Sequence, residues 1–224
     1  MTFYVRQMQR EDVAQVNEID REAFPTQWPP PDYKRELQNP LARLIVVCDD
    51  SRPDGEGEAE AKGDHRSSGF TSALRRLFFP WRSSGDTSSP QPRHHIVGFA
   101  GIWVMADEAH ITNIAVHSRY QRQGIGELLL ISIIGLSAQM NASIVTLEVR
   151  VSNIPAQRLY QKYGFVEVGT RPGYYTDNRE DALIMSTGNI TSAPFQAQFQ
   201  RLKRAHARKY GANMASQLAE TPAR

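Results

Sequence analysis

The sequence predicts an α/β domain built on a mixed sheet. Strand-like runs, such as Ile96–Met105 and Glu108–Val116, alternate along the chain with segments whose apolar residues recur at helical spacing, such as Asp12–Ala23. The chain has 224 residues, of which 40% are hydrophobic, and this is enough to bury one good core. We therefore expect one main domain over residues 1–187, followed by a tail.

The other elements are predicted from the same two periods and from turn residues. Pro29–Pro31 should break the chain before a short helix, and Pro155 suits the first turn of a later one. Further strands are expected at Phe3–Met8, Arg43–Cys48, Ile144–Val149, Phe165–Val168 and Ala182–Ser186, and further helices at Asp32–Leu37, Gly124–Met140 and Pro155–Tyr163.

Residues 49–94 interrupt this pattern. The segment is rich in Ser, Gly, Pro and charge, acidic at first and then basic, so it lacks the apolar content of a packed layer. We expect a disordered insertion. Within it, Phe70–Trp81 mixes apolar residues with arginines, which fits either an amphipathic helix that docks on a surface or a weakly ordered turn.

Residues 188–224 are expected to leave the domain as a basic tail. Phe195–Tyr210 carries five of its basic residues and could form a helix, whereas the last residues should fray.

Composition limits the function classes. A net charge of +2 is too small to argue for nucleic-acid binding. The single cysteine, Cys48, lies in an apolar run, so it is expected to be a buried strand residue in a reducing compartment. No His/Cys cluster has metal-ligand spacing, and the longest apolar run, Leu128–Leu136, is too short to span a bilayer. We expect a soluble, cytoplasmic protein without a metal.

Gln121–Gly126 is the strongest local signal. It lies between a strand-like run and an apolar helix, where free backbone N–H groups at the positive end of the helix dipole suit a pyrophosphate. Gly124 and Gly126 allow close approach of the backbone, and Arg122 adds charge. The spacing matches neither the nucleoside-triphosphate nor the dinucleotide pattern. A loop that serves only chain geometry remains the alternative at this point.

Several motifs in order extend this signal. After the pattern Asn113–Val116 and the glycine loop come Leu147–Asn153, Leu159–Phe165, Gly173–Tyr175 and Arg179–Met185. The series resembles the GNAT superfamily of acetyl-CoA-dependent N-acetyltransferases. Within it, the chain is similar to the RimI-like (ribosomal-protein-alanine) and archaeal Ard1-like protein N-terminal acetyltransferases. The resemblance covers most of Phe3–Cys48 and Ile96–Thr187.

The resemblance implies a fold and an activity. The fold is a mixed, mostly antiparallel sheet of about six or seven strands flanked by helices, splayed between the fourth and fifth strands. The implied activity is direct transfer of acetyl from acetyl-CoA to a protein N-terminal α-amine in a ternary complex, with a ribosomal protein as the usual bacterial target. A small-amine acetyltransferase and a non-catalytic acyl-CoA-binding regulator remain as alternatives.

The resemblance also assigns catalytic roles. Glu148 falls on the general-base position, although strand alternation alone favours a solvated glutamate there. Glu108 and His110 remain as residues that could assist it. Tyr160 falls on the position of the general acid, where a packing tyrosine is the structural alternative.

Binding residues are implied in the same way. The strand residues Ile114, Ala115 and Val116 would offer backbone groups to the cofactor, and Asn153 would contact it, cap the following helix, or both. The paired tyrosines Tyr174 and Tyr175 would form a loop that closes over the first residues of a protein substrate. The cofactor's phosphates would lie on the loop residues Arg122, Gln123, Gly124, Ile125, Gly126 and Glu127.

Overall fold

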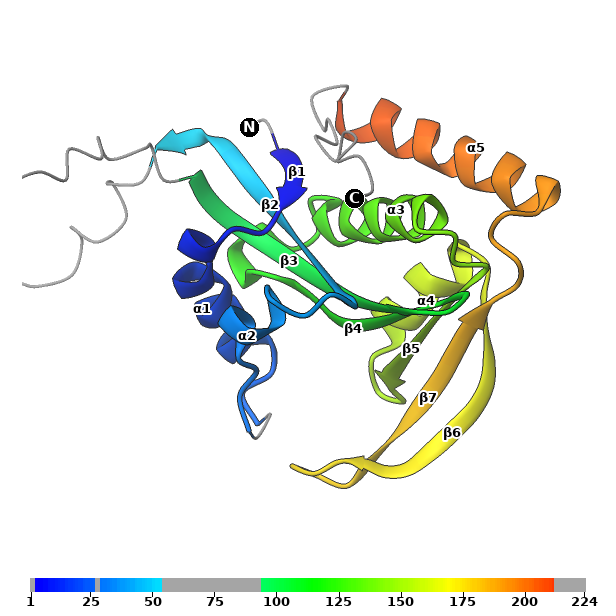
Figure 1. Cartoon of the computed structure of the whole chain (residues 1–224), viewed down its shortest axis with the longest axis horizontal. Helices are drawn as coiled ribbons and strands as arrows, with labels where there is room; N and C mark the ends of the chain where they lie inside the picture. The colour runs from blue at the N-terminus through cyan, green and yellow to red at the C-terminus, as the bar shows by residue number, and fades with distance from the viewer. Residues whose placement is uncertain (1–2, 27–28, 54–93, 212–224) are drawn as a thin grey trace, which may run out of the picture.

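The computed structural model describes residues 3–26, 29–53 and 94–211. Within these ranges the chain forms a sheet with helices on both faces (Figure 1). The strands are β1 (Phe3–Gln7), β2 (Ala42–Pro53), β3 (His94–Met105), β4 (Glu108–Val116), β5 (Ile144–Arg150), β6 (Phe165–Tyr175) and β7 (Glu180–Thr187). The helices are α1 (Val13–Ala23), α2 (Tyr33–Glu36), α3 (Ile125–Gln139), α4 (Ile154–Lys162) and α5 (Ala193–Tyr210), with short 3-10 turns η1 (Arg10–Asp12) and η2 (Ser118–Tyr120).

The seven strands form one sheet in the order β1-β2-β3-β4-β5-β7-β6. Every neighbouring pair is antiparallel except β4 and β5, which run parallel. A parallel pair needs a long crossover, and α3 supplies it. This topology confirms the predicted mixed, mostly antiparallel sheet.

The sheet has a buried cluster on each face. One cluster joins α3 and α4 to the sheet, and α5 adds Phe199 to it. The other lies under α1 and α2, where Val16, Ile19 and Tyr33 pack. Figure 1 shows α3 and α5 on one side of the sheet and α1 and α2 on the other. Helix α3 is apolar nearly all round because it lies between the sheet and α5.

The parallel pair is short, and this creates the feature on which the site depends. β4 and β5 pair over four residues, from Glu108 opposite Ile144 to Ile111 opposite Leu147, and the pairing ends there. The rest of β4 keeps its partner β3 on one edge, while the edge toward β5 has no strand partner. The predicted splay between the fourth and fifth strands is therefore confirmed.

Strand β2 continues past the predicted start of the insertion. It runs to Pro53, which pairs with His94 at the start of β3, so residues 49–53 belong to the sheet. Pairing with β3 outweighs the polar composition of these residues. Cys48 is buried in β2, as expected, and burial raises the pKa of its thiol. The patch Phe70–Trp81 lies outside the described residues.

Strand β6 is longer than predicted. The sequence predicts Phe165–Val168, whereas the strand runs on to Tyr175. It is an edge strand with register shifts, so it tolerates Gly and Pro residues. These residues interrupt the strand pattern in the sequence, and the strand was therefore predicted to end at Val168. Tyr174 and Tyr175 therefore lie at the end of a strand, before the β6–β7 turn, and not in a loop.

Residues 188–210 do not leave the domain. Ile190 is fully buried, and α5 packs back across α3 through Phe195, Phe199 and Leu202. The basic residues alternate with these apolar ones at helical spacing, so the tail has one face suited to a core and one suited to solvent.

Candidate active site

Glu148 lies where the sheet opens. It directly follows Leu147, the last residue of β5 that pairs with β4, and β7 holds the other edge of β5. Alternation along β5 sends Val145, Leu147 and Val149 into the core and Glu148 to the opposite face. The Glu148 side chain is only 8% exposed there, so the carboxylate is not simply solvated.

A chain of polar contacts leads away from Glu148 along the same face. Its Oε2 lies 3.1 Å from His110 Nε2, and His110 Nδ1 lies 3.0 Å from Thr146 Oγ1. The Thr146 hydroxyl in turn donates to Glu108 Oε1 at 2.6 Å. The short parallel ladder places His110 opposite Thr146 and so aligns this chain. The two residues considered as helpers of Glu148 are thus connected to it.

Arg171 reaches Glu148 from the hairpin. Its Nη2 lies 2.9 Å from Glu148 Oε1, and its guanidinium lies 5.5 Å from the Tyr174 ring centroid. The rings of Tyr174 and Tyr175 meet edge-on, with centroids 5.2 Å apart. The paired tyrosines therefore lie beside the carboxylate that sequence reasoning selected.

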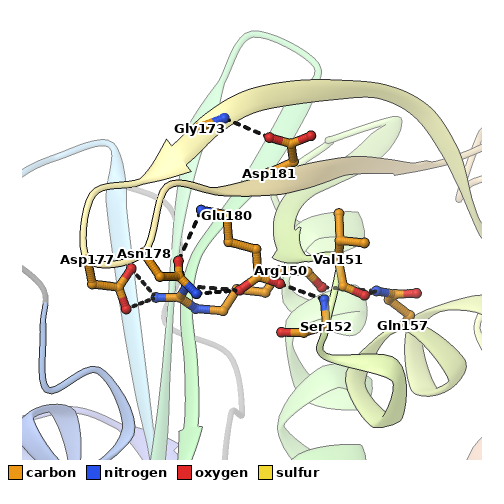
Figure 2. A network of polar contacts seen from close by, with 9 residues as sticks. All are labelled: Arg150, Val151, Ser152, Gln157, Gly173, Asp177, Asn178, Glu180 and Asp181. Atoms are coloured by element: carbon orange, nitrogen blue, oxygen red, sulfur yellow. Dashed lines mark hydrogen bonds and ion pairs between the residues drawn. The ribbon is translucent and has the colours of Figure 1, made fainter.

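A polar network fixes the tip of the β6–β7 hairpin (Figure 2). Arg150, at the end of β5, pairs with Asp177 at 2.9 Å and with Glu180 at 3.2 Å, and its guanidinium lies 3.8 Å from the centroid of the Tyr175 ring. The Ser152 N–H donates to Glu180 at 2.6 Å, and these hydrogen bonds lower the pKa of Glu180 to about 2. The network joins the hairpin to the start of α4 and holds Tyr175 in place.

Tyr160 lies on the other face of β5, on α4. Its side chain is buried, with its ring centroid 5.7 Å from that of Phe165. Its hydroxyl has no hydrogen-bond partner among the residues that the structure describes. Burial first, and then the neighbouring Tyr175, raise the pKa of Tyr160.

Tyr175 links the two faces electrostatically. Burial, followed by the charges of Tyr174, Glu148 and Glu180, raises the pKa of Tyr175 to about 12 against the lowering effect of Arg150. Tyr175 also acts on the pKa of Tyr160. Glu148 and Tyr160 project from different elements, yet both are near enough to Tyr175 to affect its titration or be affected by it.

The glycine loop has the backbone that an anion site needs. Arg122 and Gly124 both adopt left-handed conformations, with φ of 63° and 84°, and Gly124 is the N-cap of α3. Left-handed residues that alternate with ordinary ones turn successive backbone N–H groups toward one side, and here they do so at the positive end of the helix dipole. The loop follows η2 directly after β4, so it lies at the open end of the sheet.

Two predicted cofactor residues have structural partners for their side chains. Glu127 accepts hydrogen bonds from Lys162 and from the Tyr163 hydroxyl, both at 2.6 Å. Burial alone would raise the pKa of Glu127, but these two partners hold it below its ordinary value. The Asn153 side chain accepts from Ala156 N–H at 3.3 Å and caps α4. The side chain of Glu127 thus joins α3 to the end of α4.

Sequence reasoning missed Arg171 and did not assign roles to Arg150 and Glu180. Arg171 lies on β6, with β7 between its strand and β5, so its contact with Glu148 depends on strand order and register. Arg150 stood inside a recognised motif, and its position two residues after Glu148 was a signal that it lies on the same face of β5.

A mixed sheet that opens beside a glycine loop, with a shielded carboxylate at the opening, is the architecture of an acyl-transfer enzyme. The model of the Acetyltransferase (GNAT) family matches residues 13–165, and the chain belongs to this family. It is therefore an N-acetyltransferase. Members of the family take their acetyl group from acetyl-CoA.

Individual proteins similar to this chain have more specific names than the family as a whole. A Bacillus subtilis protein that carries the provisional name ribosomal protein bS18-alanine N-acetyltransferase is 35% identical over 182 residues, covering 81% of this chain and 92% of that protein. The Escherichia coli K12 ribosomal protein bS18-alanine N-acetyltransferase is 40% identical over 119 residues, covering 48% of this chain and 80% of the relative. The crystal structure of the Escherichia coli ribosomal-protein-S18-alanine N-acetyltransferase shares the fold, with a TM-score of 0.58 and 24% identity, covering 85% of this chain and 96% of that one.

Two features are absent from the part of the chain that the structure describes. Within residues 3–26, 29–53 and 94–211, no three His, Cys, Asp or Glu side chains lie together as a potential metal site. Over the same described ranges, no helix combines the length and apolar character needed to cross a bilayer.

Proposed function

We propose that this enzyme acetylates the α-amino group of a protein N-terminus, as a ribosomal-protein-alanine N-acetyltransferase. The position of Glu148 carries the proposal, because its shielded carboxylate projects from β5 directly after the last β4–β5 residue pair. Two relatives with ribosomal-protein-alanine N-acetyltransferase names align with most of their own length, which supports the same substrate class.

Acetyl-CoA supplies an acyl group that is already activated as a thioester. The residues present fit this co-substrate. Loop residues 122–127 offer backbone N–H groups for the pyrophosphate, with Arg122 and Gly124 in left-handed conformations. Ile114, Ala115 and Val116 offer a strand edge that β5 does not occupy, on which the pantetheine amides could pair as an added strand does.

Glu148 acts as the general base. An α-amine has a pKa of about 8, against about 10.4 for lysine, so part of it is already neutral near pH 7. Glu148 takes the proton that the amine sheds as the new C–N bond forms, directly or through one water. The contacts with His110 and Arg171 hold the carboxylate, and His110 together with Thr146 and Glu108 offers the proton a route onward.

Tyr160 acts as the general acid. It gives its proton to the sulfur as the C–S bond breaks and regains one from solvent. Burial raises its pKa, so the phenol keeps its proton until the thiolate forms. Glu148 and Tyr160 project on different faces of β5, so an acetyl group on which both act would have to lie in the opening between β4 and β5.

Tyr174 and Tyr175 place the peptide. They lie beside Arg171 and Arg150, and the ion pairs of Arg150 hold the hairpin tip. A fixed aromatic pair next to the base gives the first residues of a peptide a surface that a small amine would not need.

A substrate panel tests the proposed function. Purified enzyme with acetyl-CoA is offered peptides with free α-amines, beginning with Ala, the same peptides blocked at the α-amine but bearing lysine, and free polyamines. Mass spectrometry should locate the acetyl group on the α-amine, with peptides preferred over free amines by at least tenfold in kcat/KM. Equal turnover of polyamines, or acetylation of lysine only, would contradict the proposal.

A further inference from the structure

We propose that the C-terminal helix α5 is a positioning element for the acetyl-CoA loop, with His206 and Tyr210 holding Gly124. This inference rests on the proposed use of that loop for acetyl-CoA. It assigns a role to a segment that the sequence suggested only as a loose basic tail, and that lies beyond residue 165, where the family match ends.

The last turns of α5 lie directly against the loop. His206 is buried and its Nε2 lies 3.0 Å from the Gly124 carbonyl oxygen, which can only accept, so Nε2 carries the proton. A Cβ built on Gly124 would lie 2.7 Å from the Tyr210 ring, so this ring touches the loop backbone itself. The His206 and Tyr210 rings also pack on each other, with centroids 4.8 Å apart.

The far end of α5 is anchored independently of the loop. Phe199 is buried and its ring meets that of Tyr163, while the Phe195 ring covers Gly164. These contacts join α5 to α4 and to the start of β6. The helix thus extends from the connection between α4 and β6 to the start of α3, and separate contacts hold each of its two ends (Figure 1).

The hydrogen bond from His206 sets the orientation of the Ile125 N–H, one of the backbone groups proposed to donate to the pyrophosphate of acetyl-CoA. The peptide bond is planar and trans, so the Gly124 carbonyl and the Ile125 N–H point in opposite directions within one rigid unit. When His206 and Leu128 N–H hold the carbonyl, the Ile125 N–H is turned away from α5 and presented at the helix start. Gly124 itself, at φ 84°, is free to adopt other conformations, so a fixed orientation must come from its neighbours.

Holding the loop before acetyl-CoA arrives should strengthen binding. A flexible loop loses conformational entropy when it binds, and pre-ordering removes part of that cost. Neither His206 nor Tyr210 needs to touch acetyl-CoA for this effect. The expected signature is weaker acetyl-CoA binding with little change in the chemical step once the site is saturated.

The test compares His206→Ala and Tyr210→Ala with conservative variants of the full-length enzyme. The readouts are CoA affinity by titration calorimetry, together with KM for acetyl-CoA, KM for peptide, and kcat. We expect each alanine variant to bind CoA about five- to tenfold more weakly and to raise KM for acetyl-CoA equally, with kcat and peptide KM within twofold of wild type. His206→Gln, which keeps an N–H donor, and Tyr210→Phe, which keeps the ring, should restore most of the affinity.

Phe195→Leu is the matched control, because it loosens the anchored end of α5 far from the loop. It should lower Tm at least as much as the alanine variants while leaving CoA affinity near wild type. The inference is overturned if Tyr210→Ala and His206→Ala bind CoA as wild type does, or if CoA affinity simply follows Tm across all variants, Phe195→Leu included. Wild-type enzyme that binds no CoA would instead overturn the proposed function.

Discussion

Replacing Tyr160 with Phe removes one hydroxyl from the candidate site and leaves the packing of the ring intact. Tyr160 is only 7% exposed and its ring packs against Phe165, and a phenylalanine at this position keeps both the burial and the packing. The hydroxyl has no hydrogen-bond partner among the described residues, so its loss leaves no described group unpaired. We therefore expect the free energy of unfolding to change by less than about 0.5 kcal/mol.

The effect on turnover should be much larger. General acid catalysis contributes about 10²–10⁴-fold. The departing group here is a thiolate, and ordinary thiols have a pKa of about 8.5, so it leaves moderately well without help. The lower end of the range therefore applies. We expect kcat to fall by about 10²-fold, which corresponds to about 2.7 kcal/mol in the activation barrier.

Tyr163→Phe is the matched control, three residues further on at the C-terminal cap of the same helix. Its hydroxyl donates to the Glu127 carboxylate at 2.6 Å, and hydrogen bonds to charged groups contribute about 1.5–3 kcal/mol. Lys162 remains on Glu127, so we expect the lower value and a fall in Tm of about 3–6 °C. The chemical step should change little. Tyr163→Phe should therefore lower Tm and keep kcat, whereas Tyr160→Phe should lower kcat and keep Tm.

The assay measures kcat at saturating acetyl-CoA and peptide, CoA affinity by calorimetry, and Tm by thermal unfolding for both variants. Tyr160→Phe should retain CoA affinity and Tm while losing turnover. Wild-type kcat in Tyr160→Phe would refute the acid assignment. A loss of turnover that merely accompanies a lower Tm would refute the argument that the hydroxyl acts in chemistry and not in folding.

Three further predictions concern the base, the acid and the start of α4. Glu148→Gln should lower kcat/KM for peptide by about 10²–10⁴-fold at pH 7, and the loss should persist at pH 9, because the neutral amine that prevails there still sheds a proton as the C–N bond forms. Wild-type kcat/KM in Glu148→Gln would contradict the assignment. In wild type, kcat/KM should rise with pH and show no descending limb below about pH 9.5, because burial, followed by Tyr175, raises the pKa of Tyr160 above its ordinary value of about 10. Asn153→Ala removes the cap of α4 and should lower the free energy of unfolding by about 1 kcal/mol. Asn153→Asp is the control, because it keeps a side-chain acceptor. Equal Tm values for Asn153→Ala and wild type would show that the cap contributes nothing.

Local signals were sufficient for most elements. Strand β4 has the predicted bounds, Glu108–Val116, and α3 begins one residue after the predicted Gly124, because apolar periodicity and glycine are properties of short stretches. Strand β6 was missed beyond Val168, since an edge strand is held by one neighbour and can accept Gly and Pro. The end of β2 was missed for a related reason, because its last pair depends on a partner some forty residues away in sequence, His94.

The sequence by itself determined the fold class and the glycine loop, and the resemblance of its motifs to the GNAT superfamily led to the choice of Glu148 and Tyr160, because each motif is a set of residue types at fixed spacing within one segment. Only the tertiary structure decided that Arg171 crosses β7 to reach Glu148, that His110 connects Glu148 to Glu108, and that α5 returns to Gly124. These contacts join segments far apart along the chain. Their formation depends on strand order, register and helix packing, which no local pattern of residues encodes.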